Sequence, residues 1–390
     1  MTTCFEHLCN ELLLEIFNYI NPRHLYYTFW NINSRLNNLI ISVNSLQLII
    51  NEEENNELIT KLAPHIGLLQ VNTWDEIDLN GFCNLYSLTL ARPSPIQLKQ
   101  IRAEIMPNLI YLSLYSNVNF FPPKQLIDDA FSNRFSQLRC ARLGYIDSFD
   151  LAHWFQSLSL RYLHIGCYNT TMIPFVLAAC PNLKQLHVDF LRHSDKIMDS
   201  SVMINNHPLQ QLILQDYCCL VSVQDIRTLI SYIPNTSKIN MNFYCNVSFI
   251  SLVQFLSNSL SHLRRFDCFI TECPIDSATS LATIQQVHPC LNRITCPIQK
   301  ANFRVFSTNP PNKFNEAAVT NIYLRSINLA QYIAELDHYN MDKIPKLVGR
   351  HTKTIDTMEQ LFPTCYGPER VNKPDYRFIS CFNHDPTSTS

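Results

Sequence analysis

The chain has 390 residues, of which 46% are hydrophobic and only 16% are charged, and its formal net charge is -2. This balance, with no acidic or basic tail, excludes generic electrostatic binding to nucleic acid or to an anionic membrane. Its apolar runs are far shorter than the roughly 20 residues that span a bilayer. The first residues lack the pattern of a signal peptide. We therefore expect no membrane partner and a cytoplasmic or nuclear location.

The chain contains 15 Cys, but no Cys-x-x-Cys pair and no Cys/His quartet at zinc-ligand spacing. Several occupy positions where a small apolar side chain packs, as at Cys268 and Cys296. Free thiols are the expected state in a reducing compartment. We expect no cofactor and no stoichiometric metal.

Three short helices are predicted between Phe5 and about Ile40. The first carries apolar residues that recur with the helical period, at Leu12, Leu13, Ile16, Phe17 and Ile20. Asn10 is expected to cap its start. Asn21-Pro22 should end this helix and begin the second, and Asn33 or Ser34 should cap the third. Residues 1–45 are therefore predicted to form a small helical domain.

The segment from Phe5 to Ile20 resembles the opening of an F-box. That consensus runs Leu-Pro-x-Glu, an apolar stripe, Ile-Phe, an apolar pair and a later Leu. The matching residues here are Leu8, Glu11, Leu12, Ile16, Phe17, Tyr19, Ile20 and Leu25. The segment from Asn31 to Leu36, which contains Arg35, resembles the family's Val-x-x-Arg segment. Cys9 stands in place of the usual Pro, and Asn37-Asn38 stand where an aromatic residue often follows.

F-box proteins with leucine-rich repeats are substrate receptors of cullin-based ubiquitin ligases, and their F-box docks on a Skp-family adaptor. The resemblance implies that the adaptor contacts Leu8, Cys9, Leu12, Ile16, Phe17, Ile20 and Leu25. Of these side chains, Leu8, Leu12, Ile16, Phe17 and Ile20 should leave an apolar patch partly exposed. The alternative is a helical cap that covers the first repeat and binds nothing else.

A repeated apolar motif, Leu-x-x-Leu-x-Leu, occupies most of the remaining chain. Clear copies begin at Leu85, Leu109, Leu160, Leu183 and Leu209, weaker ones at Leu138, Thr236, Leu263, Leu291 and Val319, and the least regular at Val43 and Ile66. Successive copies start 19 to 29 residues apart, which is typical of leucine-rich repeats. Segments with helical period lie between them, for example residues 97–105, 225–233 and 252–256.

The fold class predicted from this pattern is α/β. A small three-helix F-box is followed by a leucine-rich-repeat horseshoe over residues 46–340, with a parallel concave sheet and outer helices. Residues 341–390 lack the repeat motif. We expect them to form a C-terminal cap followed by a disordered tail rich in Pro, Asn, Asp and Ser.

Within each motif, the third and fifth residues should point out of the concave face. The third-residue row runs Ser87, Tyr111, Cys140, Tyr162, Gln185, Gln211, Lys238, Arg265, Arg293 and Asn321. Lys238, Arg265 and Arg293 would form a ladder of like charge, with Arg325 one repeat later. We expect them to bind an acidic or phosphorylated segment of a target protein, with Tyr111 and Tyr162 as aromatic contacts. The alternative is a solvated face whose charges are screened by water.

Sequence motifs for catalysis are missing. The chain has six Gly and no Gly-rich phosphate loop, no Gly-x-Ser-x-Gly elbow and no His-Glu-x-x-His helix. We therefore predict a protein that is not an enzyme. Its expected role is the substrate-recognition subunit of a Skp–cullin–F-box-type ubiquitin ligase, whose target the sequence does not identify. The alternative role is a repeat scaffold that recruits no ligase.

Overall fold

The computed structural model of the chain describes residues 7–43, 46–51, 56–73, 76–115, 121–146, 156–167, 170–190, 206–216, 222–245, 247–273, 275, 279–300 and 303–308. These residues all belong to the unit Met1–Phe314. The motif expected at Val319, the concave-face residues Asn321 and Arg325, and the predicted C-terminal cap and tail lie outside the described residues.

Three helices open the described chain, as predicted: α1 (Asn10–Asn18), α2 (Pro22–Phe29) and α3 (Ser34–Ser42). The Asn21 side chain caps α2 by accepting a hydrogen bond from the backbone N–H of Arg23, and Pro22 takes the first helical position. Asn33 caps α3 in the same way by accepting from the N–H of Leu36. Both caps were predicted from the sequence.

The start of α1 differs from the prediction. Asn10 is the first helical residue, and Cys9 occupies the capping position without a side-chain capping hydrogen bond. The Asn10 side chain instead accepts a hydrogen bond from Nε of Arg35, at 2.9 Å. Nη2 of Arg35 donates to the carbonyl of Leu8 at 2.6 Å. Arg35 on α3 therefore satisfies backbone and side-chain acceptors at the beginning of α1.

Twelve strands of the described residues form one sheet. They are β1 (Leu46–Ile50), β2 (Ile66–Val71), β3 (Ser87–Leu90), β4 (Tyr111–Leu114), β5 (Cys140–Ile146), β6 (Tyr162–Cys167), β7 (Gln185–Phe190), β8 (Gln211–Asp216), β9 (Lys238–Cys245), β10 (Arg265–Glu272), β11 (Thr295–Gln299) and β12 (Arg304–Ser307). The strands from β1 to β10 are parallel and follow one another in sequence order.

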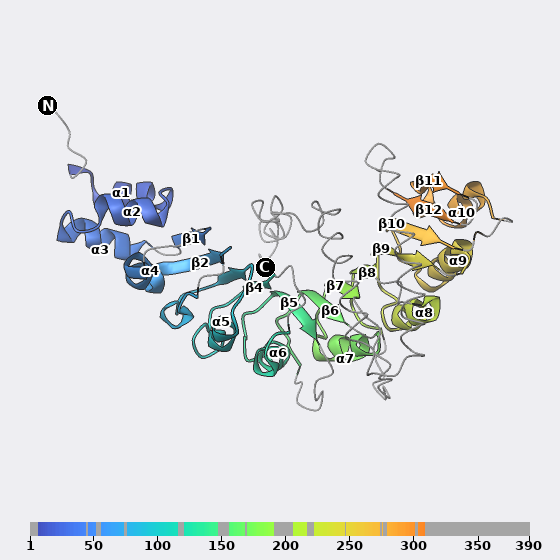
Figure 1. Cartoon of the computed structure of the whole chain (residues 1–390), viewed down its shortest axis with the longest axis horizontal. Helices are drawn as coiled ribbons and strands as arrows, with labels where there is room; N and C mark the ends of the chain where they lie inside the picture. Colours follow the sequence, from blue (N-terminus) through green and yellow to red (C-terminus); the bar gives the residue numbers. More distant parts are fainter. Residues whose placement is uncertain are drawn as a thin grey trace, which may run out of the picture. The chain divides into compact units, whose positions relative to one another are not determined.

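The helices between the strands are α4 (Asn56–Leu62), α5 (Pro95–Gln100), α6 (Lys124–Phe131), α7 (Met172–Ala179), α8 (Val223–Tyr232), α9 (Phe249–Ser259) and α10 (Leu281–Val287). Helices α5 to α9 run along one side of the sheet (Figure 1). The chain is thus an α/β protein with a mostly parallel sheet, as the repeated motif predicted. No helix in the described part of the chain is long and apolar enough to cross a bilayer.

The repeated motif sets the register of the sheet. From β3 to β10 each strand begins at the third residue of its motif, and these residues pair in one row from Ser87 to Arg265. The fourth and sixth residues are buried, as Leu186 and Val188 illustrate on β7. Third and fifth residues lie on the opposite face because side chains alternate along a strand. We call this opposite face the polar face of the sheet.

The motif expected at Val43 is displaced by two residues. Gln47 of β1 pairs with Leu68 of β2, which is the third residue of the motif that begins at Ile66. Val43 instead forms the C-cap of α3, where it is 3% exposed. The apolar Val43 at the end of α3 was therefore mistaken for the first residue of a repeat.

The motif at Leu291 does not continue the parallel series, so this prediction was wrong. β12 pairs antiparallel with β10, and β11 pairs only with β12, at the edge of the sheet. Pro297 lies in β11, where the pairing with β12 is irregular between Thr295 and Ile298. Because Pro has no N–H to donate, it is compatible with an edge strand and not with a central one.

A buried ion pair fixes the antiparallel strand. Glu272 of β10 and Arg304 of β12 are paired in register, and their side chains are 0% and 6% exposed. Arg304 Nε contacts the Glu272 carboxylate, and Arg304 Nη1 donates to the carbonyl of Thr279 at 2.7 Å. The other carboxylate oxygen accepts from the N–H of Phe249, the first residue of α9, at 2.7 Å.

The cysteines follow the prediction wherever they are described. Ten described cysteines form no disulfide: Cys9, Cys83, Cys140, Cys167, Cys180, Cys245, Cys268, Cys273, Cys290 and Cys296. Burial raises the pKa of the Cys167 thiol to about 12 and raises the pKa of the Cys180 thiol further. Such thiols remain protonated at neutral pH and act as apolar packing groups.

Candidate functional site

An exposed apolar stripe lies on α1. Leu12 is 47% exposed, Ile16 is 37% exposed, and Tyr19 at the end of the helix is 85% exposed. Spacings of four and three residues place these side chains on one helix face. The neighbouring Leu13 and Phe17 are 0% exposed and pack in the core. α1 is therefore apolar on a buried face and on a solvent-facing one.

One residue expected in this patch, and one further expected adaptor contact, are buried instead. Phe17 and Leu25 are fully buried, and the Phe17 ring lies 5.3 Å from that of Phe29. Leu8 and Ile20 are half-buried against the core, and Cys9 is exposed. The expectation of an exposed Phe17 was wrong. The sequence shows that α1 is apolar on two sides, but it does not show which of the two sides packs on α2 and α3.

A carboxylate lies beside the predicted cationic row. Lys238 of β9 and Arg265 of β10 are paired in register, and both are exposed. Arg265 Nε lies 2.5 Å from Oδ2 of Asp267, and Arg293 Nη1 lies 3.7 Å from Oδ1 of the same residue. Asp267 thus partly neutralises the row. Arg293 precedes β11 and does not belong to a strand of the parallel series.

The two tyrosines predicted as target contacts lie further along the same row. Tyr111 begins β4 and Tyr162 begins β6, and both are half-buried. Cys140 pairs with both of them in the row and is 3% exposed. The structure therefore places the tyrosines on the polar face at one level, with a small buried side chain between them.

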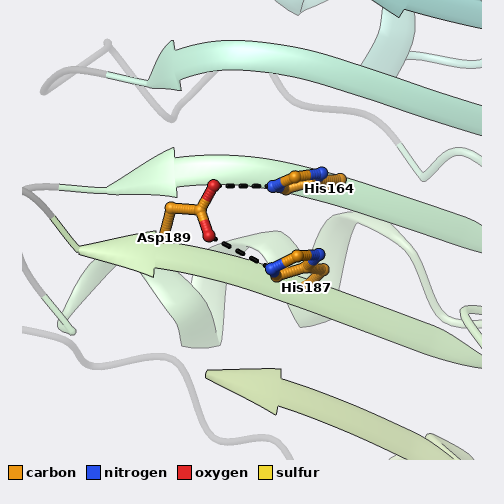
Figure 2. A group of neighbouring side chains, drawn as sticks. All are labelled: His164, His187 and Asp189. Atoms are coloured by element: carbon orange, nitrogen blue, oxygen red, sulfur yellow. Dashed lines mark hydrogen bonds and ion pairs between the residues drawn. The ribbon is translucent and has the colours of Figure 1, made fainter. Parts of the chain in front are cut away.

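A cluster that the sequence did not indicate lies in the middle of the polar face. It consists of His164 on β6 and of His187 and Asp189 on β7 (Figure 2). His164 and His187 are paired in register, and Asp189 follows His187 by two residues on the same face. Nε2 of His164 lies 2.8 Å from Oδ2 of Asp189, and Nε2 of His187 lies 3.1 Å from Oδ1. One carboxylate therefore lies against two imidazoles.

The two imidazole rings are stacked. Their centroids are 3.7 Å apart and their planes differ by 7°. A single carboxylate cannot align with both ring planes, and the 3.1 Å contact lacks hydrogen-bond geometry. Nε2 of His187 and Oδ1 of Asp189 are both buried and have no hydrogen-bond partner among the described residues. Buried polar atoms are normally paired, so this contact requires an explanation.

Burial controls the charges of the cluster. Burial, together with the neighbouring His187, lowers the pKa of His164 to about 4, although Asp189 opposes this shift. Burial alone would raise the pKa of the Asp189 carboxyl. The interactions with the two imidazoles outweigh it and hold that pKa well below its ordinary value. At neutral pH the cluster therefore contains an ionised carboxylate and an uncharged His164.

Neighbouring strands shape the space around the cluster. Gly166 of β6 pairs with Asp189, and a Cβ on Gly166 would lie 2.1 Å from ring carbons of Tyr145. The Tyr145 ring therefore covers Gly166 at this point of the sheet. Arg142 of β5 pairs with His164, and its guanidinium lies 4.6 Å from the centre of the Tyr115 ring.

An alignment of the motifs contains the signal for this cluster. His164 and His187 are the fifth residues of two consecutive motifs, those that begin at Leu160 and Leu183. Fifth residues of adjacent parallel strands are neighbours, about 4.8 Å apart. Linear spacings of Cys and His do not reveal ligands that are brought together across neighbouring strands.

No protein-family model matches the chain, and no curated protein matches it at a significant level.

Proposed function

We propose that this chain is the substrate-recognition subunit of a Skp–cullin–F-box-type ubiquitin ligase. In this proposal the three N-terminal helices are an F-box that docks on a Skp-family adaptor. The twelve-stranded sheet and its helices are a leucine-rich-repeat solenoid that binds the target protein. The observation that carries the proposal is the exposed apolar stripe of Leu12, Ile16 and Tyr19 on α1.

Two further observations support an F-box. The three predicted helices and two of their three predicted caps are present, and the arginine that matches the family's Val-x-x-Arg segment, Arg35, donates hydrogen bonds to the start of α1. A helix that serves only as a cap needs one apolar face, whereas α1 has two. An exposed apolar stripe on a helix is typical of a surface that a partner covers.

The second candidate function is a repeat scaffold without ligase recruitment. Cys9 favours it, because the family's usual Pro would preorganise the start of α1 and Cys9 provides no capping hydrogen bond. A scaffold would still bind a target through the polar face of the sheet. The two candidates therefore differ in one measurable property, which is binding of the adaptor.

The test is calorimetric titration of the full chain with a purified Skp-family adaptor. The variant Leu12→Ala/Ile16→Ala truncates two of the three stripe residues and changes no buried residue. We expect it to weaken binding at least tenfold, since each truncation of a central apolar contact removes about 1 kcal/mol or more. Phe17→Ala is unsuitable, because truncation of a buried Phe destabilises a protein by about 3–5 kcal/mol.

A matched control is Ile96→Ala on α5, which truncates an apolar side chain that is 54% exposed outside the three helices. It should leave adaptor binding unchanged. If the wild-type chain does not bind any Skp-family adaptor, or if the double variant binds as tightly as wild type, the scaffold function replaces the ligase subunit.

A further inference from the structure

We propose that His164, His187 and Asp189 form a binding site for one divalent transition-metal ion, with Zn²⁺ as the expected occupant. The site lies on the polar face of the sheet, formed by β6 and β7 (Figure 2). It does not depend on the identity of the three N-terminal helices. It also departs from the expectation of a metal-free protein that the cysteine spacing gave.

The distances suit such an ion. The three ligand atoms all lie within 4.8 Å of one another. Zn–N bonds of about 2.0–2.1 Å and Zn–O bonds of about 2.0–2.2 Å place the ligands of a tetrahedral ion roughly 3.3 Å apart. The observed distances from the carboxylate to the imidazole nitrogens are 2.8 Å and 3.1 Å. The two stacked rings must splay apart for one ion to lie in both ring planes, and rotations of the three side chains then bring their ligand atoms around the ion.

The unpaired atoms point to the same ligand. His187 Nε2 and Asp189 Oδ1 face each other, buried and without a hydrogen bond. In the metal-free protein a neutral imidazole that faces the carboxylate carries its proton on Nε2. When the ion binds, this proton moves to Nδ1 through solvent, and the Nε2 lone pair coordinates the ion. Both buried atoms then gain a partner.

The neighbouring side chains on the polar face set the charge around the cluster. Nearby groups on the same face are Arg142 of β5, which is paired with His164, and Ile213 and Gln215 of β8, which are paired with His187 and Asp189. Arg142 is the one cation among them, and it opposes the dication. Its guanidinium lies over the ring of Tyr115, the residue that follows β4.

The donor set selects the class of metal. Two imidazole nitrogens favour zinc, copper or nickel, whereas calcium and magnesium favour sets composed of oxygen ligands. The side chains of His164, His187 and Asp189 retain 11%, 15% and 22% of their exposure, so an ion can enter from solvent. Three protein ligands leave at least one coordination position for water or for a donor side chain of a bound protein.

The experiment is a Zn²⁺ titration of the full chain after removal of metal by dialysis against a chelator, with a competing chelator to define affinity. Wild type should bind one ion per chain. His187→Gln and Asp189→Asn should each weaken binding by at least about 100-fold, since even the loss of a supporting residue outside the ligands costs 10–100-fold. The matched control is His262→Gln, which removes an exposed imidazole elsewhere.

Two readouts on the wild-type chain keep the test independent of the variants' stability. The Co²⁺ derivative should show ligand-field absorption without a thiolate-to-cobalt charge-transfer band, which distinguishes this site from adventitious binding to cysteines. Zn²⁺ should also protect His164 and His187, but not His262, from acylation by diethyl pyrocarbonate, as measured by mass spectrometry. The proposal is overturned by wild type that binds no Zn²⁺, by a thiolate band, by unprotected histidines, or by folded variants that bind as tightly as wild type.

Discussion

Two carboxylates on the polar face of the sheet can be compared directly. Asp189 on β7 and Asp267 on β10 each contact two basic side chains, and each carboxylate side chain is 22% exposed. Their partners differ. The imidazoles beside Asp189 are 11% and 15% exposed, whereas the guanidiniums of Arg265 and Arg293 are 57% and 63% exposed. Burial of the basic partner, rather than the number of charges, therefore separates the two clusters.

This difference decides what each cluster can do. Around Asp267 the charges remain hydrated, so they attract one another weakly and are available to an acidic or phosphorylated partner. Around Asp189 water is largely excluded, so fixed polar atoms face one another at short distance and select a specific ligand. One face of the sheet thus offers a diffuse electrostatic surface at its C-terminal end and a defined donor set in its middle.

Glu272 extends the comparison to a fully buried carboxylate. Its side chain is 0% exposed, and it binds Arg304 of β12 and the backbone N–H of Phe249. We expect Glu272→Gln to lower the free energy of unfolding by about 3–5 kcal/mol, because it leaves the buried Arg304 without a counter-charge. Urea unfolding of the full chain, followed by circular dichroism, measures this change.

The matched control for this prediction is the double variant Glu272→Met/Arg304→Met. Replacing both members of a buried ion pair by apolar residues is often nearly neutral, so the double variant should be more stable than the single one. If Glu272→Gln loses no more stability than a change at Asp267, burial of the basic partner does not set the strength of these pairs.

The second largest effect is expected at Asp189. In metal-free protein, Asp189→Asn should lower the free energy of unfolding by about 2 kcal/mol, because the charged acceptor of the 2.8 Å hydrogen bond with His164 is lost. The measurement is the same urea unfolding, with a chelator present so that bound metal does not contribute. Stability equal to that of wild type would show that the carboxylate is as well hydrated as Asp267.

Local patterns predicted the sheet well, whereas contacts distant in sequence escaped prediction. The register from Ser87 to Arg265 was confirmed because each motif places the same apolar positions inside. The insertion of β12 was missed because it depends on Arg304 meeting Glu272, 32 residues earlier. The site of His164, His187 and Asp189 was also missed, although the predicted register places the two histidines side by side, because its ligands come from two different strands.

The smallest effect is expected at Asp267. Its ion pairs join a carboxylate to guanidiniums that are more than half exposed, and such pairs contribute about 0–1 kcal/mol. Asp267→Asn should therefore change the free energy of unfolding by at most about 0.5 kcal/mol at low salt. This change should vanish in 1 M NaCl, where the Debye length is about 3 Å.

The same substitution should also sharpen the difference in ligand preference. It removes the carboxylate that contacts both Arg265 and Arg293 and leaves Lys238 in register beside Arg265, so the local positive charge rises by one. An acidic or phosphorylated probe peptide that binds this end of the sheet should then bind the variant more tightly, and the gain should shrink as salt increases. Asn at position 189 should not have this effect, because the imidazoles beside it do not supply exposed positive charge. If Asp267→Asn instead costs about 2 kcal/mol at both low and high salt, then Asp267 is as dehydrated as Asp189 and the two ends of the face share one chemistry.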